Sequence, residues 1–497
     1  MKLGWLTLTL RCGAAVAALA VSMAGAWAQS ADALIDKLVE KGILSMKEAT
    51  ELREETDENF KQAHSMRDLM PAWVQSMKIE GDLRARYEGF FSESSFKNPG
   101  TTNVYPWQAR NRFRYRLRFG LTANMNDHLE AGMVLASGQL TTAGGNSLSP
   151  NQSFTGNGAN NYLWIQQAYG KWSPLDGPDW TANLTVGKMQ NPFQLDDLVF
   201  DPNYMPTGAG LQLGSRLSDH HAVKLTGAAF FLNDAPADLS QDPYMLGGQM
   251  RWDANWSPKI SSTLGLAYLY LGNTTNLDNL SVPNLNGGNT RNIFGALTNS
   301  YTPVVLDAAF TYTAASFPLY KGPFPIKIGG AIMYNLGAPN SDPNSPNYYS
   351  NTNFLAWNAG IAFGKAGKKG TWELSYTYKW VGADAWYEEF EDNDFGSLYW
   401  QTPQEMVSTP NGFISATPTP PPLPYPPNSN LSYYVPGTNA KGHIVRFAWS
   451  PADAFTLSLK WLLTTPITPY PYPKKSVNGM SSFPVMSRIQ VDATWRF

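Results

Sequence analysis

The sequence is poor in features on which several large protein classes depend. Among its 497 residues there is a single cysteine, Cys12, and charged residues make up only 15% of the chain. Cys12 falls within an N-terminal export signal, so the exported chain would have no disulfide, no thiol nucleophile and no cysteine-based metal site. Beyond that signal, no apolar stretch is long enough to cross a bilayer as a helix, which excludes a helical membrane protein. A net charge of −2 gives nucleic acid no electrostatic reason to bind.

The first residues have the three parts of a secretory signal peptide. Lys2 and Arg11 carry positive charge, residues 14–21 are apolar, and residues 26–28 read Ala-Trp-Ala, a cleavage site of the A-x-A type. The sequence therefore predicts a signal peptide over 1–28 and export from the cytoplasm.

Within the segment 29–74, residues 31–70 differ from everything after them, because they are charged, nearly free of aromatic residues and helical in pattern. Ser45 followed by Glu48 is a capping-box signature for the start of a helix. From Ala49 to Met70, residues spaced four and three apart form a weak heptad pattern of mainly apolar residues, which Thr56 and Asn59 interrupt. We expect a periplasmic helical segment, which one interpretation makes a coiled coil that joins protomers. A helical hairpin packed on itself and a helix that plugs the mouth of a barrel are the alternatives.

The last ten residues, Arg488 to Phe497, alternate strictly between polar and apolar side chains. Successive side chains of a strand face opposite sides, so this strand has one polar and one apolar face. The same alternation recurs over 75–497 without the long hydrophobic runs that a soluble core of this size would need. A closed barrel with lipid outside and water inside satisfies this pattern. Aromatic residues, 13% of the chain, suit the girdles at two membrane interfaces.

Alternation and turn signals mark sixteen strand candidates, an even number, as expected of a single-chain bacterial barrel. They begin near Lys78, Arg110, Leu129, Leu163, Trp180, Gly210, Ala222, Tyr244, Ile260, Thr302, Phe324, Asn353, Thr371, Gly442, Phe455 and Met486. Seven short connections alternate with eight longer loops, which places both chain ends in the periplasm. The sequence therefore predicts an all-β membrane protein. We expect a closed antiparallel transmembrane β-barrel of about 16 strands over 75–497, preceded by a short N-terminal α-helical segment.

Arginines at alternate positions of two neighbouring strands predict a basic pore wall. The set is Arg84, Arg86, Arg110, Arg112, Arg114, Arg116 and Arg118. Their neighbours along the chain are largely apolar, so the guanidinium groups would face the lumen. Closure of the barrel would add Arg488 and Arg496 from the last strand. In the alternative, Glu80, Asp82 and Glu88 neutralise some of these arginines and the pairs only brace the wall.

Other chemistry is sparse in this sequence. The adjacent His220 and His221 would face opposite sides of a strand and could not bind one metal ion, and His443 favours an interfacial role over catalysis. No metalloprotease, P-loop or serine-hydrolase signature is present. The acidic cluster at 388–394 has the carboxylates that Ca²⁺ prefers but lacks the ligand spacing of a calcium loop. We therefore expect a solvated acidic loop, and a loop that binds a cation is the alternative. We expect no enzymatic activity, no metal site and no cofactor.

The signal peptide, the helical stretch over 34–49, the alternating strands and the terminal Phe497 together resemble Gram-negative outer-membrane porins. The resemblance is to a putative-porin family in which a short helical stretch precedes the barrel. It implies a place in the cell outer membrane, with the N-terminal segment in the periplasm, and passive diffusion of small hydrophilic solutes. It also implies an assembly signal at Phe497 for the outer-membrane barrel assembly machinery, contact with outer-membrane lipid, and a homotrimer.

General porins, which this chain resembles, fold the third long loop into the lumen. The corresponding loop here, Asn191 to Gly210, carries Asp196, Asp197 and Asp201. The resemblance implies a constriction in which these acids lie opposite the arginines at 112, 114 and 116, with a transverse electric field between them. The surplus of arginine over aspartate favours a mild anion preference. A surface loop with no role in the pore is the alternative.

The sequence thus favours an outer-membrane porin that forms a water-filled channel. The rival hypothesis is a structural barrel that sheathes a redox protein or anchors a periplasmic partner through its N-terminal helices. A sheath needs a wide lumen free of constricting loops, whereas a porin needs a loop folded inward.

Overall fold

The computed structural model describes residues 71–92, 96–97, 104–105, 110–139, 148–234, 242–277, 281–284, 286–290, 297, 299–337, 354–399, 433–468 and 485–497. The chain divides into two units, Met1–Ser76 and Met77–Phe497, and the second contains nearly all of these residues. The predicted signal peptide and nearly all of the helical segment at 29–74 lie outside the described residues. Within the described residues, no helix has the length and apolar character needed to cross a membrane.

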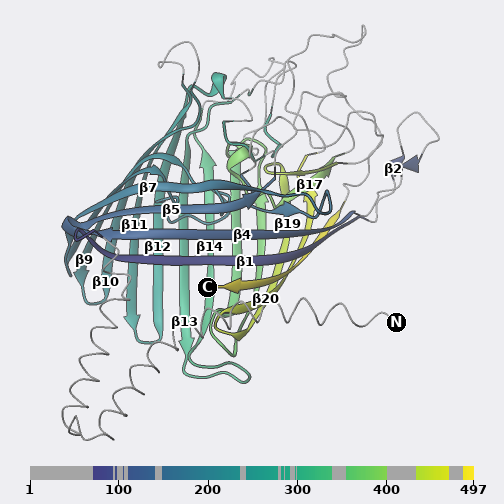
Figure 1. Cartoon of the computed structure of the whole chain (residues 1–497). Helices are drawn as coiled ribbons and strands as arrows, with labels where there is room; N and C mark the ends of the chain where they lie inside the picture. Colours follow the sequence, from purple (N-terminus) through teal and green to yellow (C-terminus); the bar gives the residue numbers. More distant parts are fainter. Residues whose placement is uncertain are drawn as a thin grey trace, which may run out of the picture. The chain divides into compact units, whose positions relative to one another are not determined.

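Sixteen long strands follow one another around a single antiparallel sheet in the described residues. They are β1 (Val74–Ser92), β4 (Arg110–Met125), β5 (Leu129–Gly138), β7 (Tyr162–Asp176), β8 (Trp180–Lys188), β9 (Thr207–Ser218), β10 (His221–Phe231), β11 (Tyr244–Ser257), β12 (Ile260–Gly272), β13 (Pro303–Ala314), β14 (Phe324–Asn335), β15 (Leu355–Gly364), β16 (Thr371–Val381), β19 (Ala440–Ala452), β20 (Phe455–Pro466) and β21 (Met486–Arg496). The last strand, β21, pairs antiparallel with β1, which closes the barrel. Figure 1 shows the yellow C-terminal strand beside the purple β1.

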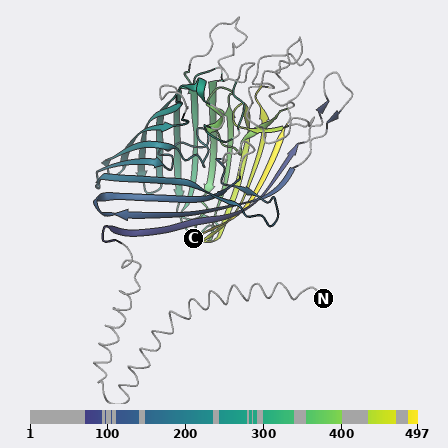
Figure 2. The same cartoon turned by 45° about the horizontal axis from the view of Figure 1, so that its top comes forward.

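Shorter elements lie in the long loops and in one of the turns. They are the hairpin β2 (Phe96–Lys97) and β3 (Val104–Tyr105), β6 (Gln152–Ser153), the pair β17 (Gly396–Tyr399) and β18 (Tyr433–Pro436), and the 3-10 turns η2 (Asn126–His128), η4 (Thr274–Asn276) and η6 (Glu388–Phe390). Four loops matter below: L2 (139–161), L3 (189–206), L5 (273–302) and L7 (382–439). Figure 2 turns the end of the barrel that carries the long loops toward the reader.

The fold prediction is confirmed, because each strand starts within four residues of its predicted position and β1, at Val74 rather than Lys78, shows the largest difference. Period-two alternation explains this success. On β20, Leu457 and Leu459 are 37% and 43% exposed on the lipid side, whereas the preceding Thr456 is 7% exposed. Charged or polar side chains on the lipid face would be unfavourable, so the register of each strand is fixed.

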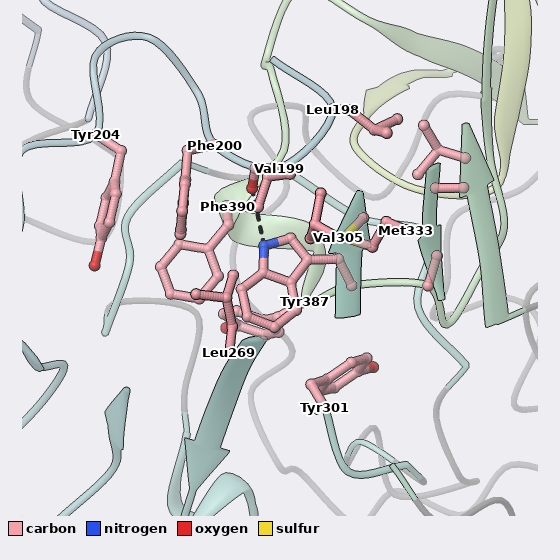
Figure 3. Close-up of a cluster of buried hydrophobic side chains, with 14 of the residues drawn as sticks. Leu198, Val199, Phe200, Tyr204, Leu269, Tyr301, Val305, Met333, Tyr387 and Phe390 are labelled. Atoms are coloured by element: carbon pink, nitrogen blue, oxygen red, sulfur yellow. Dashed lines mark hydrogen bonds between the residues drawn. The ribbon is translucent and has the colours of Figure 1, made fainter. Parts of the chain in front are cut away.

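A hydrophobic cluster lies inside the barrel, where L3, L5 and L7 pack on the inner face of β10 to β16, β19 and β20. It includes Phe200 from L3, Trp386 and Phe390 from L7, and inward side chains such as Leu269 and Met333 from the wall. Figure 3 shows Phe200 and Phe390 converging with Leu269 and Met333, from loops and strands that are far apart in sequence. The loops are therefore held in the lumen by apolar burial, which is the main stabilising term available to them.

Candidate functional site

The inner face of β1, β4 and β21 carries a dense basic surface, which we call the arginine wall. It comprises Arg84 and Arg86 on β1, Arg110, Arg112, Arg114, Arg116 and Arg118 on β4, and Arg488 on β21. Alternate residues of a strand share a face, and β1 and β21 are paired with Arg86 opposite Asp492. The structure therefore brings the arginines named from the sequence onto one wall.

Three carboxylates of the same strands neutralise part of the arginine wall. The ion pairs are Arg116 and Arg118 with Asp82 (2.6 and 2.5 Å), Arg112 and Arg488 with Glu88, and Arg86 with Asp492 (2.7 Å). The pair of Arg86 with Asp492 is bidentate, because Nε and Nη2 donate to the two carboxylate oxygens at 2.7 and 2.8 Å. Such fork-like pairs fix the guanidinium plane as well as its charge.

Arg84 and Arg114 have only distant acidic partners. Their Nη2 atoms donate to Asn151 of L2, Arg84 to the side-chain oxygen at 2.5 Å and Arg114 to the carbonyl at 3.2 Å. The carboxylate oxygens that pair with them lie farther off, at 3.7 Å on Asp492 and 3.9 Å on Glu88. The Nε atoms of both arginines have no hydrogen-bond partner among the described residues. Positive charge is thus in excess at this point of the wall.

Loop L3 folds into the lumen. Leu198 and Val199 are fully buried. Gln194 exchanges two hydrogen bonds with Gln249 of β11, at 2.8 and 3.0 Å. The indole N–H of Trp386 in L7 donates to the Val199 carbonyl at 2.9 Å, the dashed line in Figure 3. L3 therefore lies between the barrel wall and L7.

The three acids of L3 that the sequence singled out contact neutral amides and a lysine. Asp196 accepts a hydrogen bond from the Asn358 side chain of β15 at 2.7 Å. The carbonyl of Asp197 accepts a hydrogen bond from Lys379 of β16. Asp201 accepts one from the backbone N–H of Asn393 at 3.1 Å. Among the described residues, none of these acids forms an ion pair with the arginine wall.

The acids that do reach the arginine wall come from L7. Asp394 Oδ1 lies 2.7 Å from Arg488 Nη2, and its Oδ2 lies 3.5 Å from Arg86 Nη1. Asp392 lies 3.4 Å from Lys460 of β20. Burial alone would raise the pKa of Asp394, but the cations Arg488, Arg86 and Lys460 hold it well below its usual range. Asp394 therefore stays ionised and ties L7 to the wall.

The expectation of a solvated acidic loop at 388–394 is wrong. Glu388, Glu389, Glu391 and Asp392 are at most 4% exposed. Burial of so many acids is possible because cations from the wall and amide donors from L5 compensate for the lost water. Within the described residues, no group of three or more acids, histidines or cysteines is arranged to hold a metal ion.

Three asparagines of L5 donate hydrogen bonds to backbone carbonyls in residues 383–391 of L7. We call Asn284, Asn286 and Asn289 the asparagine clamp. Asn284 donates to the carbonyls of Glu389 and Glu391, Asn286 to those of Glu388 and Glu391, and Asn289 to those of Ala383 and Trp386, all at 2.7 to 3.2 Å. Buried carbonyls at the end of a short helical turn need such donors. The clamp explains how an irregular loop stays fixed inside the barrel.

The C-terminal residue seals the junction of β21 with β1. The backbone N–H and carbonyl of Phe497 pair with those of Gly81, at 3.1 and 2.8 Å. A Cβ on residue 81 would lie 2.6 Å from the Phe497 ring, so only glycine leaves room for the ring there. Phe497 is 61% exposed on the outside of the barrel.

Sequence reasoning missed L5 and L7 as parts of the site. One signal was present: residues 266–271 of β12 are apolar at every position, where a strand facing water on one side would alternate. When a strand is apolar on both faces, an apolar part of the protein is expected to cover its inner face and exclude water. The partners that cover it are set by tertiary contacts, which the pattern of one strand does not specify.

Comparisons with known proteins give one family match and several structural likenesses. Residues 92–293 match a family described as "Putative porin", so the resemblance to that family is confirmed. Solved structures similar to the chain include OprB of Pseudomonas putida (9% identity, 88% of this chain and 97% of that chain, TM-score 0.45), the outer membrane channel DcaP of Acinetobacter baumannii (10%, 86% and 99%, 0.37) and OccK11 (OpdR) of Pseudomonas aeruginosa (10%, 86% and 97%, 0.36). No curated protein sequence matches the chain.

Proposed function

We propose that this chain, an outer-membrane porin-like channel, passes small hydrophilic solutes with a mild preference for anions. The solutes pass through a constriction, the waist of the channel, which lies between the arginine wall and the loops L3 and L7. The surplus of positive charge at Arg84 and Arg114, whose Nε atoms have no partner within the described part of the chain, carries the proposal. Fixed charge on a low-dielectric wall attracts counter-ions to a narrow passage. We propose no cofactor and no enzymatic step.

The inward course of L3, L5 and L7 supports a porin over the rival sheath. A barrel that sheathes another protein needs an open lumen, and here Leu198, Trp386 and Phe390 fill part of it with a packed core. The asparagine clamp fixes that filling in place. A narrowed lumen of this kind suits small solutes.

Reversal potentials in planar bilayers test the anion preference. We expect the wild-type channel to be weakly anion-selective in asymmetric salt. The double variant Arg84→Gln, Arg114→Gln should shift the reversal potential toward cations. The matched control is Arg216→Gln, which removes an exposed arginine at the periplasmic end of β9. A wild-type channel without anion selectivity, or a double variant that behaves as the control does, would contradict the proposal.

We further propose that residues 29–74 form a periplasmic helical segment that joins three protomers. The heptad between Ala49 and Met70 supports this proposal. Removing residues 31–70 of the chain should convert trimers to monomers in native mass measurement while conductance per barrel persists. Wild-type protein that is already monomeric would refute it.

A further inference from the structure

The turn between β13 and β14 folds back over the outer surface of the barrel. Trp372 of β16 lies on the same face as Leu374 and Tyr376, which are each 42% exposed on the lipid side. Phe324 belongs to the outward set of β14, yet it is fully buried, because Phe317 of the turn stacks on its ring at 4.1 Å. The turn therefore covers one edge of the lipid-facing surface, at the end of the barrel away from the long loops (Figure 1).

The neighbouring turn, between β15 and β16, holds this turn in place. The Tyr320 hydroxyl donates to the Lys365 carbonyl at 3.1 Å, and the Lys321 N–H donates to the Gly370 carbonyl at 3.1 Å. A Cβ added to Gly370 would lie 3.3 Å from the Lys321 Cβ, so the two turns are in contact. We call the two segments together the turn pair (315–323 and 365–370).

Leu319 is the tip of the turn pair, and its backbone conformation costs free energy. Its φ is +60°, in the left-handed region that favours glycine, and the Tyr320 N–H donates to the Phe317 carbonyl at 3.2 Å across the turn. The indole N–H of Trp372 fixes the Leu319 carbonyl at 2.9 Å. The Leu319 side chain is 94% exposed. Strain of this kind gathers at functional sites, and packing within the barrel gives no compensation for it.

The turn pair also carries four lysines. Lys321 follows the tip by two residues, and the facing turn adds Lys365, Lys368 and Lys369, all of them exposed. Within the described part of the chain, none of the four side chains forms an ion pair. The acid that contacts the turn pair there is Asp453, which accepts a hydrogen bond from the Lys369 backbone N–H at 2.7 Å. The turn pair therefore combines an apolar tip with a net positive charge.

We propose that the turn pair binds anionic phospholipid headgroups at the periplasmic leaflet of the outer membrane. Short turns of outer-membrane barrels lie on the periplasmic side, so the turn pair lies at that surface. There the rings of Trp372 and Tyr320 lie at headgroup level, Leu319 enters the acyl boundary, and the lysines contact phosphate groups. Burial of Leu319 in lipid offsets the cost of its conformation.

The position of the tip favours a lipid over a soluble periplasmic protein. Phe317, Phe324 and Trp372 belong to the surface that faces lipid, and the tip continues that surface beyond the ends of the strands. Lysines at the same edge match the negative charge of phosphate groups. The inference rests on the outer-membrane barrel and is independent of the proposed anion preference.

Quenching of a single fluorophore by brominated lipids tests the proposal on the full exported chain. The label is attached at Leu319→Cys, since Cys12 lies in the predicted signal peptide. The protein is placed in vesicles of phosphatidylcholine and phosphatidylglycerol, in which one lipid or the other is brominated. Brominated phosphatidylglycerol should quench the label several-fold more strongly than brominated phosphatidylcholine. Adding Lys321→Gln and Lys368→Gln should bring this ratio down toward one.

Two controls fix the meaning of the quenching ratio. Arg216→Gln with Lys441→Gln removes two positive charges from other parts of the barrel and should keep the ratio. A label at Asp219→Cys, in the exposed β9–β10 turn, should give a ratio close to one. A ratio close to one at Leu319→Cys, or a raised ratio that loss of the two lysines leaves unchanged, would overturn the proposal. A label that neither lipid quenches would also overturn it, because the tip would then meet water or a periplasmic protein.

The unfolding midpoint of the unlabelled protein in vesicles gives a second readout. We expect the midpoint of the wild-type chain to rise as phosphatidylglycerol replaces phosphatidylcholine, because a lipid that binds only the folded barrel stabilises it. The rise should be smaller in Lys321→Gln, Lys368→Gln and unchanged in Arg216→Gln, Lys441→Gln. Equal rises in the two double variants would overturn the site, because the lipid would then act elsewhere on the barrel.

Discussion

Two sides of the same barrel send different side chains into the lumen. On β1, β4 and β21 the inward positions carry arginines and carboxylates. On β10 to β14 the inward positions nearest the long loops are apolar and at most 1% exposed: Phe230, Met245, Leu269, Val305 and Met333. What covers each side explains the difference. L3, L5 and L7 keep water from the apolar side, whereas the arginine wall is only partly covered.

The contrast shows that the polarity of a strand's inward side chains depends on what they contact in the lumen. Charged side chains are tolerated where water or a partner charge remains, and apolar ones where a loop replaces water. L7 touches both sides, since Phe390 packs in the hydrophobic cluster while Asp394 bonds Arg488 and Arg86. L7 therefore bridges the two sides.

Removing the aromatic ring of Trp386 from the hydrophobic cluster should have the largest effect on the stability of the packed loops. Trp386 is fully buried, stacks on Phe390 at 5.2 Å and bonds Val199 of L3. Trp386→Ala should destabilise the packed loops by about 3–5 kcal/mol. We expect larger, noisier conductance and faster proteolysis within L7. Trp386→Phe, which keeps a ring, should lose only about 1 kcal/mol with the hydrogen bond. Equal behaviour of the two variants would show that the cluster does not hold the loops.

Neutralising the charged side should change selectivity and also weaken the wall. The triple variant Arg112→Gln, Arg114→Gln, Arg116→Gln removes three positive charges from the first half of β4. We expect the reversal potential to move toward cations. Each lost charged hydrogen bond costs about 1.5–3 kcal/mol, so the heat-modifiable folded fraction must be measured beside it. A folded triple variant with the wild-type reversal potential would remove these arginines from the pathway of the ions.

The strands and the arginine wall could be predicted from the sequence because both depend on period two. Arg110 to Arg118 alternate with apolar residues, and only one assignment of faces keeps the charges out of lipid. Assigning the two faces of a strand needs no knowledge of contacts between distant segments of the chain. The barrel and its basic side therefore follow from local pattern and from closure of the sheet.

The loop side could not be predicted in the same way. Asn284, Asn286 and Asn289 look like ordinary loop residues, and their donors find partners about one hundred residues away, as for Asn284 and Glu389. The acids at 388–394 look solvated until Lys379 and Lys460 are known to lie beside them. Burial of polar groups depends on such long-range partners, which periodicity does not encode.

Deleting Phe497 should weaken the pairing of β21 with β1, which closes the barrel at the arginine wall. The deletion removes two backbone hydrogen bonds to Gly81 and the ring that covers that glycine. The two bonds together contribute about 1–3 kcal/mol. We expect less folded, heat-modifiable barrel in outer membranes and normal selectivity in the fraction that folds. Phe497→Tyr, which keeps an aromatic ring, is the control. An unchanged folded fraction would argue against an assembly signal at this residue.

The acids of L3 should give the smallest change, because none of them forms an ion pair with the arginine wall among the described residues. Asp196 bonds a neutral amide and Asp201 is surrounded by L5 and L7, so little of their charge reaches the ions. Asp196→Asn, Asp197→Asn, Asp201→Asn should shift the reversal potential slightly toward anions. Asp392→Asn, Asp394→Asn should shift it further, since Asp394 directly neutralises Arg488 and Arg86. Loss of that buried pair also costs about 3–5 kcal/mol, so both variants are compared only in folded protein. A larger shift in the L3 variant than in the L7 variant would place the L3 acids, rather than Asp394, opposite the arginine wall in the conducting channel.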